Sequence, residues 1–142
     1  MDSAWTTRLL VVANRTVESE EVRHAIVERA AAGPLHVTLV APVSSGTGSL
    51  RARRTATADR VERAAQRLSQ AGVTVDAVVG DADPMVAVQA VWNPRRFDEV
   101  IVATRPSGAS RWMAADLPRR VERLTGARVT RVVAGGRLAA MS

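Results

Sequence analysis

The chain has 142 residues, of which 46% are hydrophobic and 24% charged, and its formal net charge is +6. The composition is typical of a globular protein, and the length predicts one domain with its own core. The sequence excludes a membrane span, because no apolar run approaches about 18 residues. It also excludes disulfides and thiolate metal sites, because it has no cysteine. No signal-peptide pattern is visible, so we expect a cytoplasmic protein.

The first elements are predicted by apolar periodicity. A continuous apolar run over 8–13 predicts a strand that is buried on both faces. Beyond a polar turn, apolar residues at helical spacing predict a helix over 19–32, with Ser19 as its N-cap. A second strand is predicted over 35–43.

The middle of the chain is basic. A low-complexity linker over 44–50 precedes a predicted helix over 55–71, which Gly72 ends. The stretch 51–67 holds six arginines, and no lysine occurs anywhere among the 20 basic residues. A phosphate loop that depends on a lysine is therefore excluded. A third strand is predicted over 73–79.

The next helix and strand carry clear boundary signals. Asp81 is predicted to form a turn and Asp83 to cap a short apolar helix over 85–92, with Pro84 in its first turn. We prefer these roles to a metal site, since two carboxylates alone bind a cation poorly. The apolar run that follows predicts a fourth strand over 98–104.

The chain closes with a helix and a strand. A helix is predicted over 116–124, with Asp116 as its N-cap and Pro118 in its first turn. A fifth strand follows over 129–134, and residues 135–142 are expected to be a tail beyond the core of 8–134. Alternating strands and helices predict β-α-β units and a parallel sheet in one domain. Ligands of such sheets bind beyond the carboxyl ends of the strands, so we expect function at the turn after Val102.

The order of the elements and three local segments together resemble the universal stress protein family. The segments are Val79-Gly80-Asp81 leading through Pro84 into a short helix, the strand 98–104, and the closing run 126–133. The resemblance extends from Leu9 to Ala134. It implies an adenine-nucleotide-binding α/β fold, with an open five-stranded parallel sheet in the order 3-2-1-4-5 and helices on both faces.

The sequence departs from the ATP-binding members of that family. Asn14 stands where they carry an aspartate after the first strand. Their Gly-x-x-Gly turn after the fourth strand corresponds here to residues 103–108, which keep only Gly108, and Leu117-Pro118-Arg119 lies near their next glycine. Glycines let backbone amides approach phosphate, so triphosphate binding then depends on whether Ser107 and Ser110 replace them.

The resemblance places an adenine nucleotide such as ATP, or a related anion, between the ends of the first and fourth strands. The expected base side is Asn14, Ala41 and Val43, and the expected phosphate side is Thr104, Arg105, Ser107, Gly108, Ser110 and Arg111. The arginines can neutralise phosphate and the serines can supply hydroxyls. Each part has a structural alternative, because Asn14 is also a common turn residue and the arginine-containing loop is also typical of a solvated surface.

No acid and base pair, nucleophile or metal site is visible, so we predict a binding or regulatory module without catalytic residues. Three alternatives stay open. The first is a degenerate member that acts through dimerisation and protein partners. The second is an enzyme of the wider ATP-hydrolysing α/β group. The third is a nucleic-acid-binding protein.

Family members usually dimerise, often through the last strand, and this implies a homodimer in which that strand pairs from Val129 to Val133. Nucleic acid is the less favoured partner. The six arginines of 51–67 suit it, but one Phe, three Trp and no Tyr leave few rings for base stacking. A solvated basic helix is the interpretation we prefer.

Overall fold

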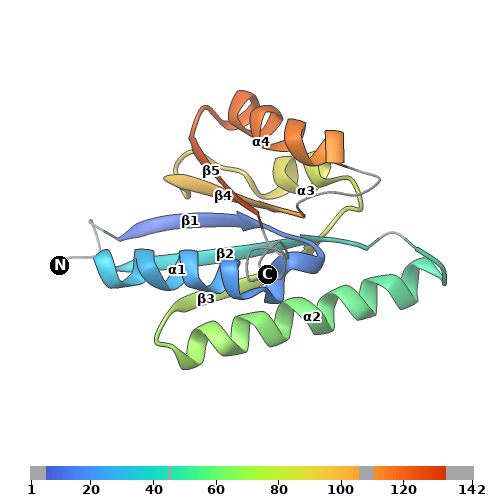
Figure 1. Ribbon diagram of the computed structural model, residues 1–142, viewed down its shortest axis with the longest axis horizontal. Helices are drawn as coiled ribbons and strands as arrows, with labels where there is room; N and C mark the ends of the chain where they lie inside the picture. The colour runs from blue at the N-terminus through green and yellow to red at the C-terminus, as the bar shows by residue number, and fades with distance from the viewer. Residues whose placement is uncertain (1–5, 45, 106–110, 134–142) are drawn as a thin grey trace, which may run out of the picture.

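The five strands form one parallel sheet in the order β3-β2-β1-β4-β5 (Figure 1), which confirms the predicted α/β fold and strand order. The computed structural model describes residues 6–44, 46–105 and 111–133, the side chains of 111–115 excepted. The predicted tail therefore lies outside the described residues. The strands are β1 (Thr7–Val12), β2 (Leu35–Pro42), β3 (Thr74–Gly80), β4 (Glu99–Thr104) and β5 (Arg128–Val133).

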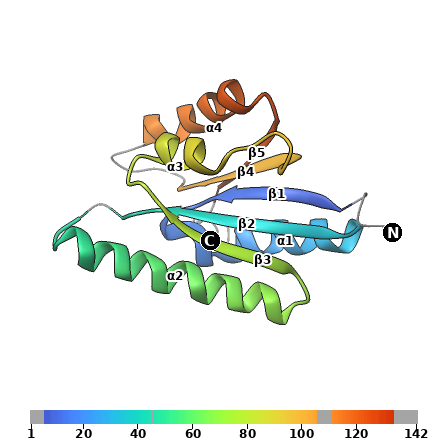
Figure 2. The ribbon, with the colours of Figure 1, turned by 180° about the vertical axis from the view of Figure 1, so that it is seen from behind.

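Helices cover both faces of the sheet. The described helices are α1 (Glu20–Ala32), α2 (Leu50–Gln70), α3 (Pro84–Val91) and α4 (Arg111–Thr125), with a short 3₁₀ helix, η2 (Arg15–Glu18), after β1. Figures 1 and 2 show α1 and α2 on one face and α3 and α4 on the other. This arrangement follows from right-handed crossovers, because the chain moves from β1 to β3 in one direction and then returns to β4 and β5 in the other.

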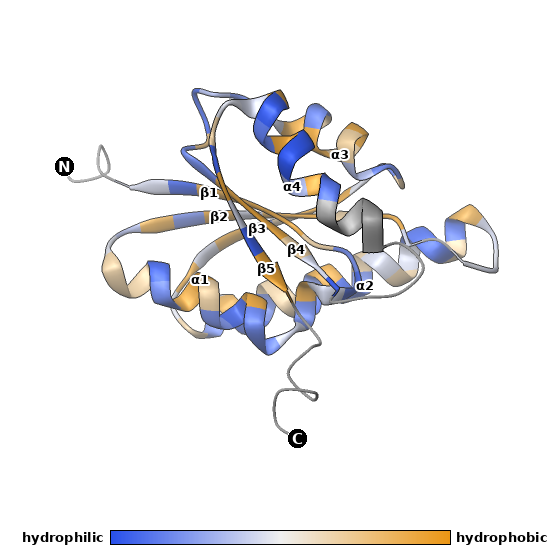
Figure 3. Cartoon of the chain, turned by 45° about the horizontal axis from the view of Figure 1, so that its top comes forward, coloured by the Kyte–Doolittle hydropathy of each residue, from blue (hydrophilic) through white to orange (hydrophobic). Residues whose placement is uncertain are grey.

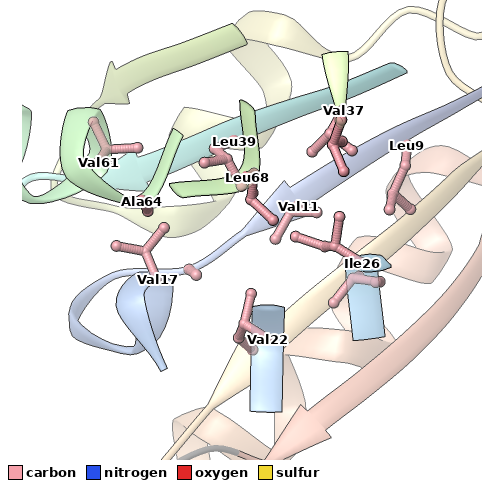
Figure 4. Packing of buried hydrophobic residues seen from close by; sticks show 14 of the residues in the cluster. Leu9, Val11, Val17, Val22, Ile26, Val37, Leu39, Val61, Ala64 and Leu68 are labelled. Atoms are coloured by element: carbon pink, nitrogen blue, oxygen red, sulfur yellow. The ribbon is translucent and has the colours of Figure 1, made fainter. Parts of the chain in front are cut away.

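Two cores lie on the two faces of the central strand. Leu9 and Val11 of β1 join the core under α1 and α2, whereas Leu10 and Val12 join the core under α3 and α4. Figure 4 shows the first core, where Ile26 of α1 approaches the side chains of β1. The predicted apolar run is thus buried on both faces, and Figure 3 shows the strands in mainly hydrophobic colours.

Helix α1 begins as predicted, because Ser19 Oγ accepts a hydrogen bond from Val22 N at 3.2 Å. Helix α2 begins five residues before the predicted start. Ser49 Oγ accepts from Ala52 N at 3.0 Å and caps the helix at Leu50. Its first three residues are exposed, so the first turn carries no buried apolar face from which periodicity could have detected it. Capping and good helix formers are sufficient there.

Helix α3 has the predicted start. Asp81 Oδ1 accepts from Asp83 N at 2.9 Å, and Asp83 Oδ1 accepts from Met85 N at 2.9 Å. Pro84 occupies the first turn. Met85 and Trp92 are partly buried and pack against the core under α3 and α4.

The predicted start of the last helix was wrong. Helix α4 begins at Arg111, so Asp116 lies inside it and forms an ion pair with Arg120 at 3.8 Å. Pro118 is also interior, where it removes one backbone donor from the helix. The helix continues past this defect because Leu117 and Val121 pack against the core on the α3 and α4 face. Such packing outweighs the local signal of an acidic residue followed by proline.

Gly80 of β3 lies directly against helix α3. A Cβ at this position would lie 2.6 Å from Ala87 Cβ and 3.3 Å from Val40 Cγ1. We therefore expect Gly80→Ala to lower the free energy of unfolding by about 1–3 kcal/mol, since the added methyl overpacks the core. Urea unfolding measures this change. Gly33→Ala is the matched control, because no atom lies within 4 Å of its Cβ position. Equal effects of the two substitutions would contradict the close approach.

Candidate functional site

The carboxyl ends of β1 and β4 lie side by side. Their register pairs Val12 with Val102 at the end of the ladder. Asn14 and Thr104 each stand two residues beyond this pair, so both belong to the same edge of the sheet. Thr104 is buried and its Oγ1 accepts a hydrogen bond from Arg131 Nε of β5 at 3.3 Å.

The other predicted residues are placed less favourably or are not described. Ala41 is fully buried in the core under α1 and α2, and Val43 is 2% exposed. Neither presents side-chain surface to a ligand at the base side in this structure. Arg105 is exposed directly after β4. Ser107, Gly108 and Ser110 lie outside the described residues, and so does the side chain of Arg111.

Asn14 is joined to a polar cluster that sequence reasoning missed. Its Oδ1 accepts from Ser44 Oγ at 3.1 Å, and Arg60 Nη1 donates to the same Ser44 Oγ at 3.0 Å. Arg53 Nη1 donates to the Ser44 carbonyl at 3.2 Å. Ser44 N donates to Thr57 Oγ1 at 3.1 Å, which in turn donates to the Arg53 carbonyl at 2.9 Å. We call these five residues the Ser44 cluster.

The Ser44 cluster brings the segments that follow β1 and β2 into contact with the first half of α2. Ser44 and Thr57 are buried, whereas the two arginines are half-buried. The sequence held one usable signal, since Arg53, Thr57 and Arg60 recur at helical spacing and share one face of α2. Ser44 itself lies in the low-complexity linker, where no periodicity marks it.

Charge compensation differs along α2. Arg63 and Arg67 pair with Glu18 and Glu20, each at 3.1 Å. Arg63 donates hydrogen bonds to the Glu18 carboxylate, and these bonds together with the negative charge of Glu18 raise the pKa of Arg63 above its ordinary value. Arg53 and Arg60, by contrast, form no ion pair with any described carboxylate. The positive charge of α2 is therefore neutralised toward its end and left uncompensated at the carboxyl edge of the sheet.

Other polar groups lie away from this edge. Arg29 pairs with Glu99 at 2.9 Å beside an open hollow of about 430 Å³ near the amino ends of the strands. His36 Nε2 lies 2.8 Å from Asp76 Oδ2 on β3, and His24 is exposed on α1. Across the described chain, no three His, Asp or Glu side chains gather as ligands of a metal ion.

No protein-family model and no curated protein matches the sequence. Over the described residues, no helix has both the length and the apolar character to cross a membrane. The family resemblance therefore remains a prediction.

Substitution of Thr57 tests how much the hydrogen bonds of the Ser44 cluster contribute to the stability of the fold. We expect Thr57→Val to lower the free energy of unfolding by about 1–3 kcal/mol, because the buried Ser44 N–H loses its acceptor. Urea unfolding provides the measurement. Thr55→Val is the matched control, since Thr55 is exposed on the same helix. A loss of equal size in the control would mean that helix propensity, and not the hydrogen bond, causes the effect.

Proposed function

We propose that this chain is a universal-stress-protein-like binding or regulatory module. Its ligand is an adenine nucleotide or a related anion, bound at the carboxyl edge of the sheet between β1 and β4. It acts by binding and not by catalysis, since the Ser44 cluster contains neither an acid and base pair nor an activated nucleophile.

The proposal is supported mainly by the strand order, which reverses its direction across the sheet at β1. Strand β2 lies on one side of β1 and β4 on the other, and the helices after β1 and β4 cover opposite faces. The loops after these two strands therefore diverge. In open parallel sheets, ligands bind in the crevice at such a switch point.

The polar groups at this edge favour a ligand that is rich in acceptors. Asn14 Oδ1 is already used by Ser44 Oγ, while its amide group has no partner among the described residues and is free to donate. A ribose oxygen, a ring nitrogen of adenine or a phosphate oxygen can accept from it. Arg105 adds an exposed positive charge at the end of β4. Ser107, Ser110 and Arg111 complete the phosphate side in this proposal.

Calorimetry with ATP and magnesium near physiological ionic strength tests the nucleotide site. We expect micromolar binding to the wild type and about ten-fold weaker binding to Arg105→Gln, which loses a charge-assisted contact to phosphate. Arg95→Gln is the matched control, because Arg95 is exposed before β4, at the opposite edge of the sheet.

Absence of heat at millimolar ATP would contradict the nucleotide site. Equal losses of ATP affinity in Arg105→Gln and Arg95→Gln would mean that the net charge of the protein, and not a contact of Arg105, causes the effect. The same samples, followed for release of phosphate, separate binding from hydrolysis, and steady turnover that Arg105→Gln abolishes would favour the enzyme alternative.

The outermost strand β5 favours the alternative in which the protein acts through dimerisation. Of the described strands, β5 pairs with β4 alone, and its last residue Val133 is 41% exposed. An unpaired edge is a template for a second copy, and two β5 strands would join two sheets into one.

Light scattering after gel filtration tests this edge. We expect the wild type to elute as a dimer and Val133→Lys to shift toward monomer, because a charge on the edge strand β5 disfavours its pairing with a second copy. Val86→Lys on α3 alters a valine that is 42% exposed and serves as control. A dimer that survives Val133→Lys, or a monomeric wild type, would count against β5 pairing.

A further inference from the structure

Two arginines of α2 converge on one residue at the carboxyl edge. Arg53 and Arg60 are seven residues apart, about two helical turns, and so share a face of the helix. Arg53 Nη1 reaches the Ser44 carbonyl at 3.2 Å and Arg60 Nη1 reaches Ser44 Oγ at 3.0 Å. Both guanidinium groups are therefore held beside the residue that hydrogen-bonds to Asn14.

These two cations are partly removed from water without a counter-charge. Both residues are half-buried and form no ion pair with a described carboxylate, unlike Arg63 and Arg67 on the same helix. Arg53 Nε is buried and finds no acceptor among the described residues. A desolvated charge and a buried donor without a partner are both unfavourable. An anion beside the two groups would relieve both costs.

The unused hydrogen-bonding capacity here consists of donors. Each guanidinium has five N–H groups and no acceptor, and Arg53 and Arg60 each spend one donor atom on Ser44. The free amide of Asn14 adds further donors. Planar guanidinium groups match the oxygens of phosphate in pairs. The chemistry of the cluster thus selects a phosphate group over a neutral or cationic ligand.

We propose that Arg53 and Arg60 of the Ser44 cluster form an anion site that holds a phosphate group on the β2 side of the carboxyl edge. The inference rests on the proposed function for the identity of the whole ligand, but the anion site itself does not require the adenine base. It adds a second source of positive charge to the arginines that follow β4.

The test compares three ligands on matched variants. ATP, inorganic pyrophosphate and adenosine are titrated with magnesium into the wild type, Arg53→Gln and Arg60→Gln. Arg54→Gln is the control, because it removes the same charge from an exposed residue of the same helix. We expect about ten-fold weaker binding of ATP and pyrophosphate to each of the first two variants, which lose a charge-assisted contact. Adenosine binding and the control should not change.

Circular dichroism verifies that each variant is folded. Arg53→Lys and Arg60→Lys keep the charge but lose the planar fork, so their affinities should fall between those of the wild type and the Gln variants. These Lys variants carry the test if a Gln variant does not fold.

The outcomes separate the anion site from the nucleotide site. Pyrophosphate binding that the Arg53 and Arg60 variants leave intact, or that Arg54→Gln weakens equally, would overturn the anion site, while ATP binding would still support the proposed function. Pyrophosphate binding that is lost in these variants, with no binding of ATP or adenosine to the wild type, would support the anion site and contradict the nucleotide site. A wild type that does not bind pyrophosphate overturns the inference.

Discussion

The burial of β1 on both faces is the constraint on which the rest of the structure depends. Four consecutive apolar side chains, from Leu9 to Val12, are 0–2% exposed and point alternately into two cores. A strand of this kind cannot form half of a two-layer fold, because it needs a helical layer on each side. The chain meets this need by covering one face before β3 and the other after it. The same reversal separates the loops that follow β1 and β4, so the candidate site is a consequence of how the core is covered.

The arginines differ in their contacts, and the main difference is whether a carboxylate lies within reach of the guanidinium. Where a glutamate is within reach, as for Arg63 and Arg67, the guanidinium joins two elements and its charge is neutralised. Arg53 and Arg60 also join two elements, through Ser44, but no described carboxylate neutralises them. Arg105 is exposed after β4 and forms neither kind of contact with the described residues. The net charge of +6 therefore says little about function, whereas the position of the uncompensated charges relates directly to the edge of the sheet.

The fold could be predicted well because the buried faces of strands and helices place apolar residues at regular spacing in the sequence. The run over 8–13, the cap at Ser19 and the turn with cap at Asp81 and Asp83 each have local causes that survive in the structure. The first turn of α2 could not be found because it buries no apolar face. The start of α4 was misplaced because the sequence offers an acidic residue followed by proline at Asp116 and Pro118, which resembles an N-cap but lies inside the helix. The Ser44 cluster was missed for a related reason. The hydrogen bonds that Ser44 forms link it to residues 9 to 30 positions away, and no local pattern encodes such contacts.

The ion pair at the opposite edge has a consequence for how the molecule opens. Arg29 donates to Glu99 Oε2 through two nitrogens, at 2.9 and 3.2 Å, and to the Ala25 carbonyl. Among the described residues of β5, it hydrogen-bonds to Thr130 Oγ1 alone, at 3.3 Å. That last contact closes a loop of 101 residues. If β5 separates from the sheet, Arg29 loses one bond and α1 stays anchored to β4. We therefore expect any local opening of β5 to leave the contact between α1 and β4 in place, so that the central strands stay protected from hydrogen exchange.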